Sequence, residues 1–127
     1  EMVEAIRTFT GQTSLQIETG NLQLRRDFLD VRDAVRALAM VAVPECASVM
    51  AGKTYNLGRG EASPLAEVLQ MLLDASKSDA TQRTDPARLR PNDPPALWAD
   101  ISKLEMDTDW RPERGLKDSL AELVSAG

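Results

Sequence analysis

Helix-type and strand-type hydrophobic patterns alternate along this chain of 127 residues, and this alternation limits the folds open to it. The clearest helix pattern begins after Ser63-Pro64, a capping serine followed by a proline suited to the first helical position. A second helix pattern begins at the capping residue Asp30 and is expected to end at Pro44. Its apolar positions are predicted to form one inward face: Val31, Ala34, Val35, Leu38 and Ala42.

Shorter segments complete the predicted order of elements. Strand-type segments are expected over 15–18, 24–29, 54–57 and 81–84, and further helices over Glu1–Phe9, after Asp100 and after Gly115. Short strands interspersed with amphipathic helices predict a mixed α/β fold with a small sheet and packed helices. The length suits one domain, which we expect to span residues 1–127.

Missing residue types exclude several kinds of catalytic site. The chain has no histidine, so it cannot supply a Ser-His-Asp or Cys-His nucleophile. Cys46 is the only cysteine, which excludes an internal disulfide and a zinc site of nitrogen and sulfur ligands. No pair of carboxylates stands at a spacing typical of acid–base catalysis. We therefore predict neither catalytic nor metal-binding residues in this chain.

Charge and hydropathy restrict the expected partners. The net charge is −5, which disfavours general nucleic-acid binding. The longest apolar run, Ala37 to Val43, is far shorter than the roughly 20 residues of a membrane-spanning helix. A lone thiol fits a reducing compartment. We therefore expect a cytoplasmic protein with no nucleic-acid or membrane partner.

Two arginine clusters are the candidates for binding an anion. Arg25 and Arg26 are adjacent at a predicted strand, and paired guanidinium groups suit a diphosphate. Arg88 and Arg90 alternate in an extended loop, where Asp93 could accept hydrogen bonds from sugar hydroxyls. Four of the seven prolines fall between positions 85 and 95 and stiffen this loop. A solvated, charge-compensated pair and an ordinary surface loop are the alternative interpretations.

Two other motifs are interpreted as structural. Gly58-Arg59-Gly60 lacks the third glycine of a dinucleotide-binding fingerprint, and Glu61 would repel a pyrophosphate there, so the motif predicts a turn. Lys53 and Tyr55 stand two positions apart, whereas a proton-relay pair on one helix face needs three or four. This spacing favours packing within a strand.

A family resemblance follows from motifs in consecutive order along the chain. Residues 20–37 resemble the segment "GNL…RDF.DVRD.VRA" of extended short-chain dehydrogenases/reductases, the nucleotide-sugar epimerases and dehydratases. Residues 55–60 resemble their "YN.G.G" turn, and residues 85–112 resemble their "D…RLRP.D.P…D.SKL…TGW.P" ending. Within the family, the motif at residues 85–112 is most similar to that of GDP-6-deoxy-4-keto-mannose reductases and then to that of GDP-mannose 4,6-dehydratases.

The resemblance covers the C-terminal, substrate-binding part of such enzymes. It implies that the cofactor loop and the catalytic Tyr-x-x-x-Lys belong to an N-terminal Rossmann-type half, so NAD(P) is expected only in a full-length relative. Residue by residue, it implies that Arg26 and Arg90 contact a nucleotide diphosphate and that Asp93 contacts the ribose. Asn21 and Leu22 would line the base pocket, with Arg25 auxiliary.

Two functions remain as hypotheses. In the first, the chain is a GDP-sugar or other nucleotide-sugar binding domain that is not catalytic alone and pairs with a Rossmann-type half. In the second, it is a free-standing module that reuses the fold for protein interaction or oligomerisation. An apolar wall left open would favour a homodimer.

Overall fold

A computed structural model describes residues 16–126, and the helix expected over Glu1–Phe9 lies outside them. The described residues form two compact units. The first unit comprises residues 16–25, 64–95 and 117–126, and the second comprises residues 26–63 and 96–116. None of the helices among residues 16–126 has the length and apolar content needed to cross a membrane.

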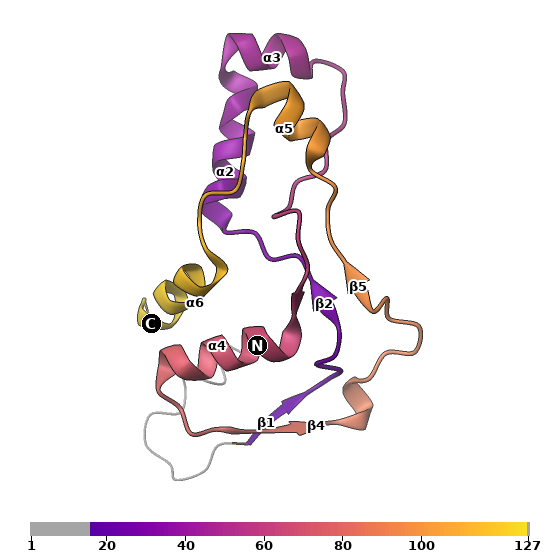
Figure 1. Cartoon of the computed structure of the whole chain (residues 1–127), viewed down its shortest axis with the longest axis vertical. Coiled ribbons are helices and arrows are strands. Elements are labelled where there is room, and N and C mark those ends of the chain that lie inside the picture. Colours follow the sequence, from indigo (N-terminus) through magenta and orange to yellow (C-terminus); the bar gives the residue numbers. More distant parts are fainter. Residues whose placement is uncertain (1–15, 127) are drawn as a thin grey trace. The chain divides into compact units, whose positions relative to one another are not determined.

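The first unit contains a crossover between two parallel strands (Figure 1). Strand β1 (Gln16–Thr19) pairs in parallel with β4 (Thr81–Thr84), so that Gln16 is opposite Thr81 and Thr19 is opposite Thr84. Helix α4 (Leu65–Ser76) precedes β4, and α6 (Leu116–Ser125) lies beside α4. The core of this unit consists of Ile17, Leu69 and Leu72, with Leu22, Leu73, Ala80, Leu120 and Val124 packed against it.

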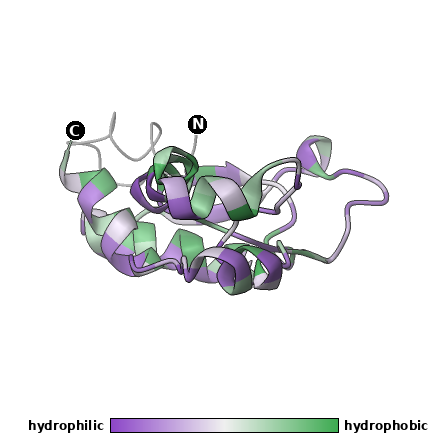
Figure 2. Ribbon diagram, turned by 90° about the horizontal axis from the view of Figure 1, so that it is seen from above, coloured by the Kyte–Doolittle hydropathy of each residue, from purple (hydrophilic) through white to green (hydrophobic). Residues whose placement is uncertain are grey.

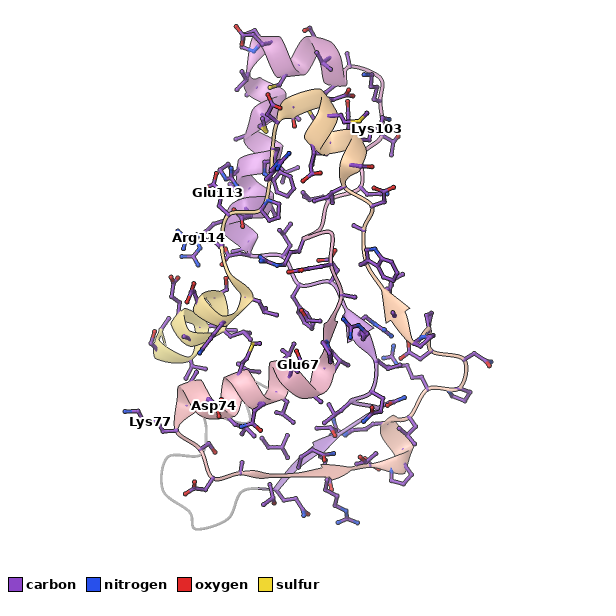
Figure 3. The ribbon with its side chains drawn as sticks, viewed as in Figure 1. Glu67, Asp74, Lys77, Lys103, Glu113 and Arg114 are labelled. Atoms are coloured by element: carbon purple, nitrogen blue, oxygen red, sulfur yellow. The ribbon has the colours of Figure 1, made fainter. Side chains whose placement is uncertain are left out.

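Helix α4 forms where the sequence predicts it. Its inward positions are apolar, and green apolar bands alternate with polar bands along the helices in Figure 2, as expected for helices with one buried side. It ends at Lys77, which adopts a left-handed conformation with φ of 52° and donates its backbone N–H to the Asp74 carbonyl. Figure 3 shows Lys77 at this end of the helix.

The second unit is mainly helical. It contains α2 (Val31–Ala39), the 3₁₀ turn η1 (Met40–Ala42), α3 (Pro44–Met50) and α5 (Ser102–Thr108). Its buried core consists of Ala37, Ile101, Leu104 and Trp110. Trp110 is 2% exposed, and its indole N–H donates to the Asp33 carbonyl oxygen at 3.2 Å.

Three strands of two residues each form a second sheet, in the order β3-β2-β5. They are β2 (Arg25–Arg26), β3 (Ser63–Pro64) and β5 (Ala96–Leu97). The Arg25 backbone N–H donates to the Pro95 carbonyl at 2.9 Å, and the Asp27 N–H donates to the Leu97 carbonyl at 3.1 Å. Small sheets with packed helices confirm the predicted mixed α/β class.

Helix α2 begins as predicted but presents a different face. Asp30 caps it, and its carboxylate accepts the Arg32 backbone N–H at 2.8 Å. The predicted inward face is wrong, because Val31, Val35 and Leu38 are 58–71% exposed, while Asp33 on the other side is buried. The polar contacts of Asp33, described below, hold that side of the helix inward.

Other boundaries also differ from the sequence predictions. The helix that begins at Val31 ends at Ala39, before the end predicted at Pro44. Pro44 is instead the first residue of helix α3, because proline is compatible with the first helical turn. Ser63 and Pro64 form strand β3, so α4 begins one residue later than its predicted first position and has no side-chain cap. Residues 54–57 are not a strand, and the strand expected over 24–29 shortens to two residues.

Candidate functional site

The first unit holds a cavity of about 540 Å³ that extends along β1 to the segments that follow β1 and β4. The segment after β1 contributes Gly20, Asn21 and Leu22, and the loop after β4 contributes arginine and aspartate side chains. Parallel strands bring the segments that follow them to the same sheet edge, which is where α/β folds usually bind ligands. The lining residues are Gln16 to Leu22, Leu24, Leu65, Arg88, Arg90 and Asp93.

Close backbone contact fixes the loop after β4 against the end of β1. The Asp85 N–H donates to the Thr19 carbonyl at 2.9 Å, directly beyond the paired strands. A Cβ atom added at Gly20 would lie 2.9 Å from the Arg88 carbonyl oxygen, so only glycine fits without a shift. Asp85 then caps the 3₁₀ turn η2 (Pro86–Arg88) by accepting the Ala87 N–H.

The two arginines of the loop differ in their surroundings. The Arg88 Nε lies 3.4 Å from the Asp85 carboxylate, so this guanidinium is already engaged by an acid on the same loop. The Arg90 side chain is exposed and makes no hydrogen bond or ion pair with any residue in the range 16–126. Arg90 is therefore the better-placed cation for a ligand phosphate, because a guanidinium can form two parallel hydrogen bonds with it.

The rest of the lining combines two acids with an apolar wall. Glu18 and Asp93 balance the formal charges of the two arginines, so a phosphate would be attracted only at the arginine side. Leu22, Leu24 and Leu65 supply apolar surface on which a ring could pack. The Asn21 carboxamide oxygen accepts the Gln23 N–H at 2.9 Å, which shapes the turn after β1.

The structure thus gathers four of the six predicted site residues around one cavity: Asn21, Leu22, Arg90 and Asp93. Arg25 belongs to the same unit but does not line this cavity. Arg26 belongs to the second unit, where it lines a different cavity of about 580 Å³. Whether any of the six contacts a ligand stays a prediction.

The carboxylate of Asp27 organises the wall of the second-unit cavity. It accepts three backbone N–H groups, from Arg59 at 2.7 Å and from Gly60 and Ala99 at 3.1 Å each. A Cβ atom at Gly58 would lie 2.5 Å from this carboxylate, so glycine is required beside it. Residues 58–60 therefore form the expected turn, and the acid that follows Arg26 holds that turn in place.

Asp107 of α5 accepts a hydrogen bond from each member of the Lys53–Tyr55 pair. Its Oδ2 accepts the Tyr55 hydroxyl at 2.7 Å and the Lys53 ammonium at 2.8 Å. Hydrogen bonds from Lys53 and Tyr55 lower the pKa of Asp107, while burial and the bond to Asp107 raise the pKa of Tyr55. Lys103, labelled in Figure 3, lies over the Tyr55 ring at 4.7 Å. The interpretation of this pair as strand packing is wrong, because the pair joins a loop to a helix.

Sequence reasoning missed several contributors to these cavities. Glu18 and Leu65 have no motif around them, and the sequence does not single out Asp27 as a structural residue. Trp98 lines the second-unit cavity, and no sequence motif indicated it as a site residue. For Asp27, the one available sequence signal was its position directly after two arginines in the family motif. Among the described residues, no group of three His, Cys, Asp or Glu side chains is arranged to hold a metal ion.

Comparison with known proteins places the chain in a family. The family model of GDP-mannose 4,6 dehydratase matches residues 2–123. The GDP-6-deoxy-D-mannose reductase of Pseudomonas aeruginosa is 30% identical over 116 residues, which cover 91% of this chain and 36% of that protein. Among solved structures, that of RMD from Pseudomonas aeruginosa complexed with NADPH is similar, with a TM-score of 0.81 and 26% identity.

A putative epimerase from Burkholderia cenocepacia is also similar, with a TM-score of 0.82 and 30% identity. Each structural match covers 98% of this chain but only 39% and 38% of the respective solved chains. The chain therefore spans little more than a third of the length of these relatives. It belongs to the GDP-mannose 4,6 dehydratase family of extended short-chain dehydrogenases/reductases and corresponds to their C-terminal part.

Proposed function

We propose that this chain binds a nucleotide sugar, and more narrowly a GDP-sugar, through the cavity of the first unit. The observation that carries the proposal is the gathering of Arg90, Asp93, Asn21 and Leu22 around one cavity at the ends of parallel strands. The cavity volume, about 540 Å³, falls within the range of small-molecule sites. The relative with 30% identity is named as acting on a GDP-sugar, which supports the choice of nucleotide.

The chemistry of the lining suggests how such a ligand would be held. The Arg90 guanidinium would form charge-assisted hydrogen bonds with the diphosphate. The Asp93 carboxylate would accept hydrogen bonds from vicinal ribose hydroxyls, and Leu22 would pack on the base. The proposal assigns binding to this chain and leaves the reaction, with its NAD(P), to the Rossmann-type half of a full-length relative.

The decisive variant is Arg90→Ala, with Arg83→Ala as its matched control. Both arginines are exposed and belong to the first unit, but Arg83 lies on β4 and does not line the cavity. Hydrogen bonds to charged groups contribute about 1.5–3 kcal/mol, so loss of Arg90 should weaken GDP binding by about tenfold or more. Isothermal titration calorimetry with GDP and UDP measures the effect, and circular dichroism checks that each variant is folded.

Saturable GDP binding that weakens with salt and is lost in Arg90→Ala, but not in Arg83→Ala, would support the proposal. Equal affinity of the two variants would refute the role of Arg90. Absence of heat with either nucleotide, from a folded sample, would refute the binding function itself.

The exposed side of α2 favours a second candidate, the interaction module. Val31, Val35 and Leu38 are 58–71% exposed along one stripe of this helix. Apolar stripes of this kind usually contact another protein surface. A stable dimer in analytical ultracentrifugation, combined with no effect of nucleotides on the melting temperature, would favour this candidate over nucleotide-sugar binding.

A further inference from the structure

Glu18 is an acid of the first-unit cavity that no hydrogen bond or ion pair ties to the fold described by residues 16–126. It stands on strand β1, where Ile17 and Thr19 are buried and Glu18 between them is exposed. In the parallel register it is opposite Arg83, yet no ion pair joins these two described residues. Within the described range, both oxygens of this carboxylate are therefore without a donor.

Asn21 adds groups of the opposite polarity to the same segment. It follows Glu18 by three residues, beyond the end of β1, and also lines the cavity. Its carboxamide oxygen accepts the Gln23 N–H at 2.9 Å, so the amide is oriented by the turn. The NH₂ group of Asn21 donates to no residue in the range 16–126. The β1 segment thus brings two carboxylate acceptors and an amide donor to the cavity.

The two ends of a ligand are distinguished by the segments that carry these groups. Arg90 and Asp93, assigned above to the diphosphate and the ribose, belong to the loop after β4. Glu18 and Asn21 belong to β1 and the segment that follows it. Because a carboxylate repels a phosphate, the β1 segment suits the uncharged ring of the ligand. Leu22, in the same segment, supplies apolar surface for that ring.

Guanine is the common nucleobase whose hydrogen-bonding edge matches this set of groups. Its N1–H and its exocyclic amino group are adjacent donors, and the neighbouring O6 is an acceptor. A carboxylate can accept two parallel hydrogen bonds, and a carboxamide can donate to a carbonyl oxygen. Adenine, cytosine and uracil do not present two adjacent donors on that edge.

From these observations, we propose that Glu18 is the residue that selects the base. Its carboxylate accepts the N1–H and the amino group of guanine, and the Asn21 amide donates to O6. The inference rests on the proposed function and deepens it by naming how the cavity distinguishes GDP from other nucleoside diphosphates. Glu18, Asn21, Arg90 and Asp93 all belong to the first unit.

A series of nucleoside diphosphates tests the contacts one group at a time. Inosine diphosphate differs from GDP only in lacking the exocyclic amino group. The wild-type chain should bind it about tenfold more weakly, because one hydrogen bond to a charged group is lost. In Glu18→Ala, GDP and inosine diphosphate should bind with equal affinity. Titration calorimetry measures both ratios, and circular dichroism checks that the variant is folded.

Glu18→Gln provides a test that a merely structural role would not satisfy. Xanthosine diphosphate carries a carbonyl oxygen where GDP carries the amino group. A glutamine carboxamide can accept from N1–H and donate to that oxygen, so Glu18→Gln should prefer xanthosine diphosphate, whereas the wild type prefers GDP. Removal of a negative charge alone would change the affinities for all diphosphates together, so the ratio of the two affinities is the readout.

Glu67→Gln is the matched control for this substitution. Glu67 is an exposed acid of helix α4 in the same unit and does not line the cavity; it is labelled in Figure 3. The variant loses the same charge and should keep the wild-type preference for GDP. Equal changes of preference in Glu18→Gln and Glu67→Gln would refute the role of Glu18.

The outcomes separate this inference from the proposed function. If the wild type binds GDP, but binds inosine diphosphate or UDP equally tightly, selection by Glu18 is refuted while nucleotide-sugar binding stands. A preference for GDP that survives in Glu18→Gln would also refute it, because another residue would then select the base. If a folded chain binds none of these diphosphates, the inference and the proposed function are refuted together.

Discussion

In the second unit the carboxylates of Asp27 and Asp33 are occupied by backbone N–H groups, whereas in the first unit the guanidinium of Arg90 is exposed beside a cavity. The acids join segments that are distant in sequence, so their charges stabilise the fold. Arg90 joins no such segments among the described residues, so its charge can act on a ligand. The comparison shows that the hydrogen-bond partners of a charged residue, more than its type, separate a structural role from a binding role.

Asp33 is the clearest case of a structural charge. Its side chain is buried and accepts the N–H groups of Glu113 at 3.1 Å and Arg114 at 2.9 Å. It also accepts a guanidinium hydrogen bond from Arg36 at 2.9 Å. Figure 3 shows Glu113 and Arg114 on the segment that runs along α2. These contacts turn the polar side of α2 inward and leave its valines exposed.

The largest effect on stability should come from Asp33→Asn. The substitution keeps the shape of the side chain but places an amide donor opposite groups that are themselves donors. We expect a loss of about 3 kcal/mol in the free energy of unfolding. Urea denaturation measures it, with Asp79→Asn at an exposed loop position as control. A loss of less than about 0.5 kcal/mol would show that Asp33 does not organise this unit.

The same residue predicts how stability depends on pH. Burial alone would raise the pKa of Asp33, but hydrogen bonds from Arg114, Arg36 and Glu113 outweigh burial and lower the pKa below its ordinary value. The folded state therefore binds this proton less readily than the unfolded state. Its stabilisation is present above the ordinary aspartate pKa and is lost as the pH falls through the lowered value. In Asp33→Asn, this part of the acid sensitivity should disappear.

A smaller effect on stability, with a clearer effect on binding, is expected for Gly20→Ala. The added methyl group would lie 2.9 Å from the Arg88 carbonyl oxygen and would push away the loop that carries Arg90. Overpacking of this kind costs about 1–3 kcal/mol, and the displaced loop should also weaken GDP binding. Calorimetry and thermal denaturation measure the two effects.

Gly52→Ala is the matched control for this substitution. Gly52 has φ of 70° and open space around the position of a Cβ atom, so it should lose about 1 kcal/mol of stability through backbone strain alone. GDP affinity should be unchanged in Gly52→Ala. Similar affinities in the two variants would mean that the loop position does not control binding.

The smallest effect on the fold is expected for Arg26→Ala, which tests whether the second unit also contributes to ligand binding. The side chain is half-buried on a two-residue strand, so stability should change by no more than about 1 kcal/mol. GDP affinity should fall by about tenfold if Arg26 holds a phosphate. Arg111→Ala is the control, since its side chain is 76% exposed and lines neither cavity. An unchanged affinity would confine binding to the first unit.

The sequence predicted most of what depends on neighbouring residues. The helix after Ser63-Pro64, the Asp30 cap, the strand at 81–84 and the final helix all occur within a residue or two of their expected positions. The proline-rich loop was also recognised as a place where arginines could be held rigidly. These features follow from local periodicity, capping and backbone restriction, which act over a few residues.

What the tertiary structure decided depends on contacts across long separations in the chain. The parallel pairing of β1 with β4 brings Asn21 and Arg90 to one cavity, and no local pattern indicates that pairing. Asp33 lies 80 residues before Glu113, whose N–H it accepts, and this contact reverses the face of α2 that the valines predicted. Apolar periodicity gives the shape of a helix, but a buried charge must be satisfied wherever its donors lie, and that requirement fixed the orientation of α2.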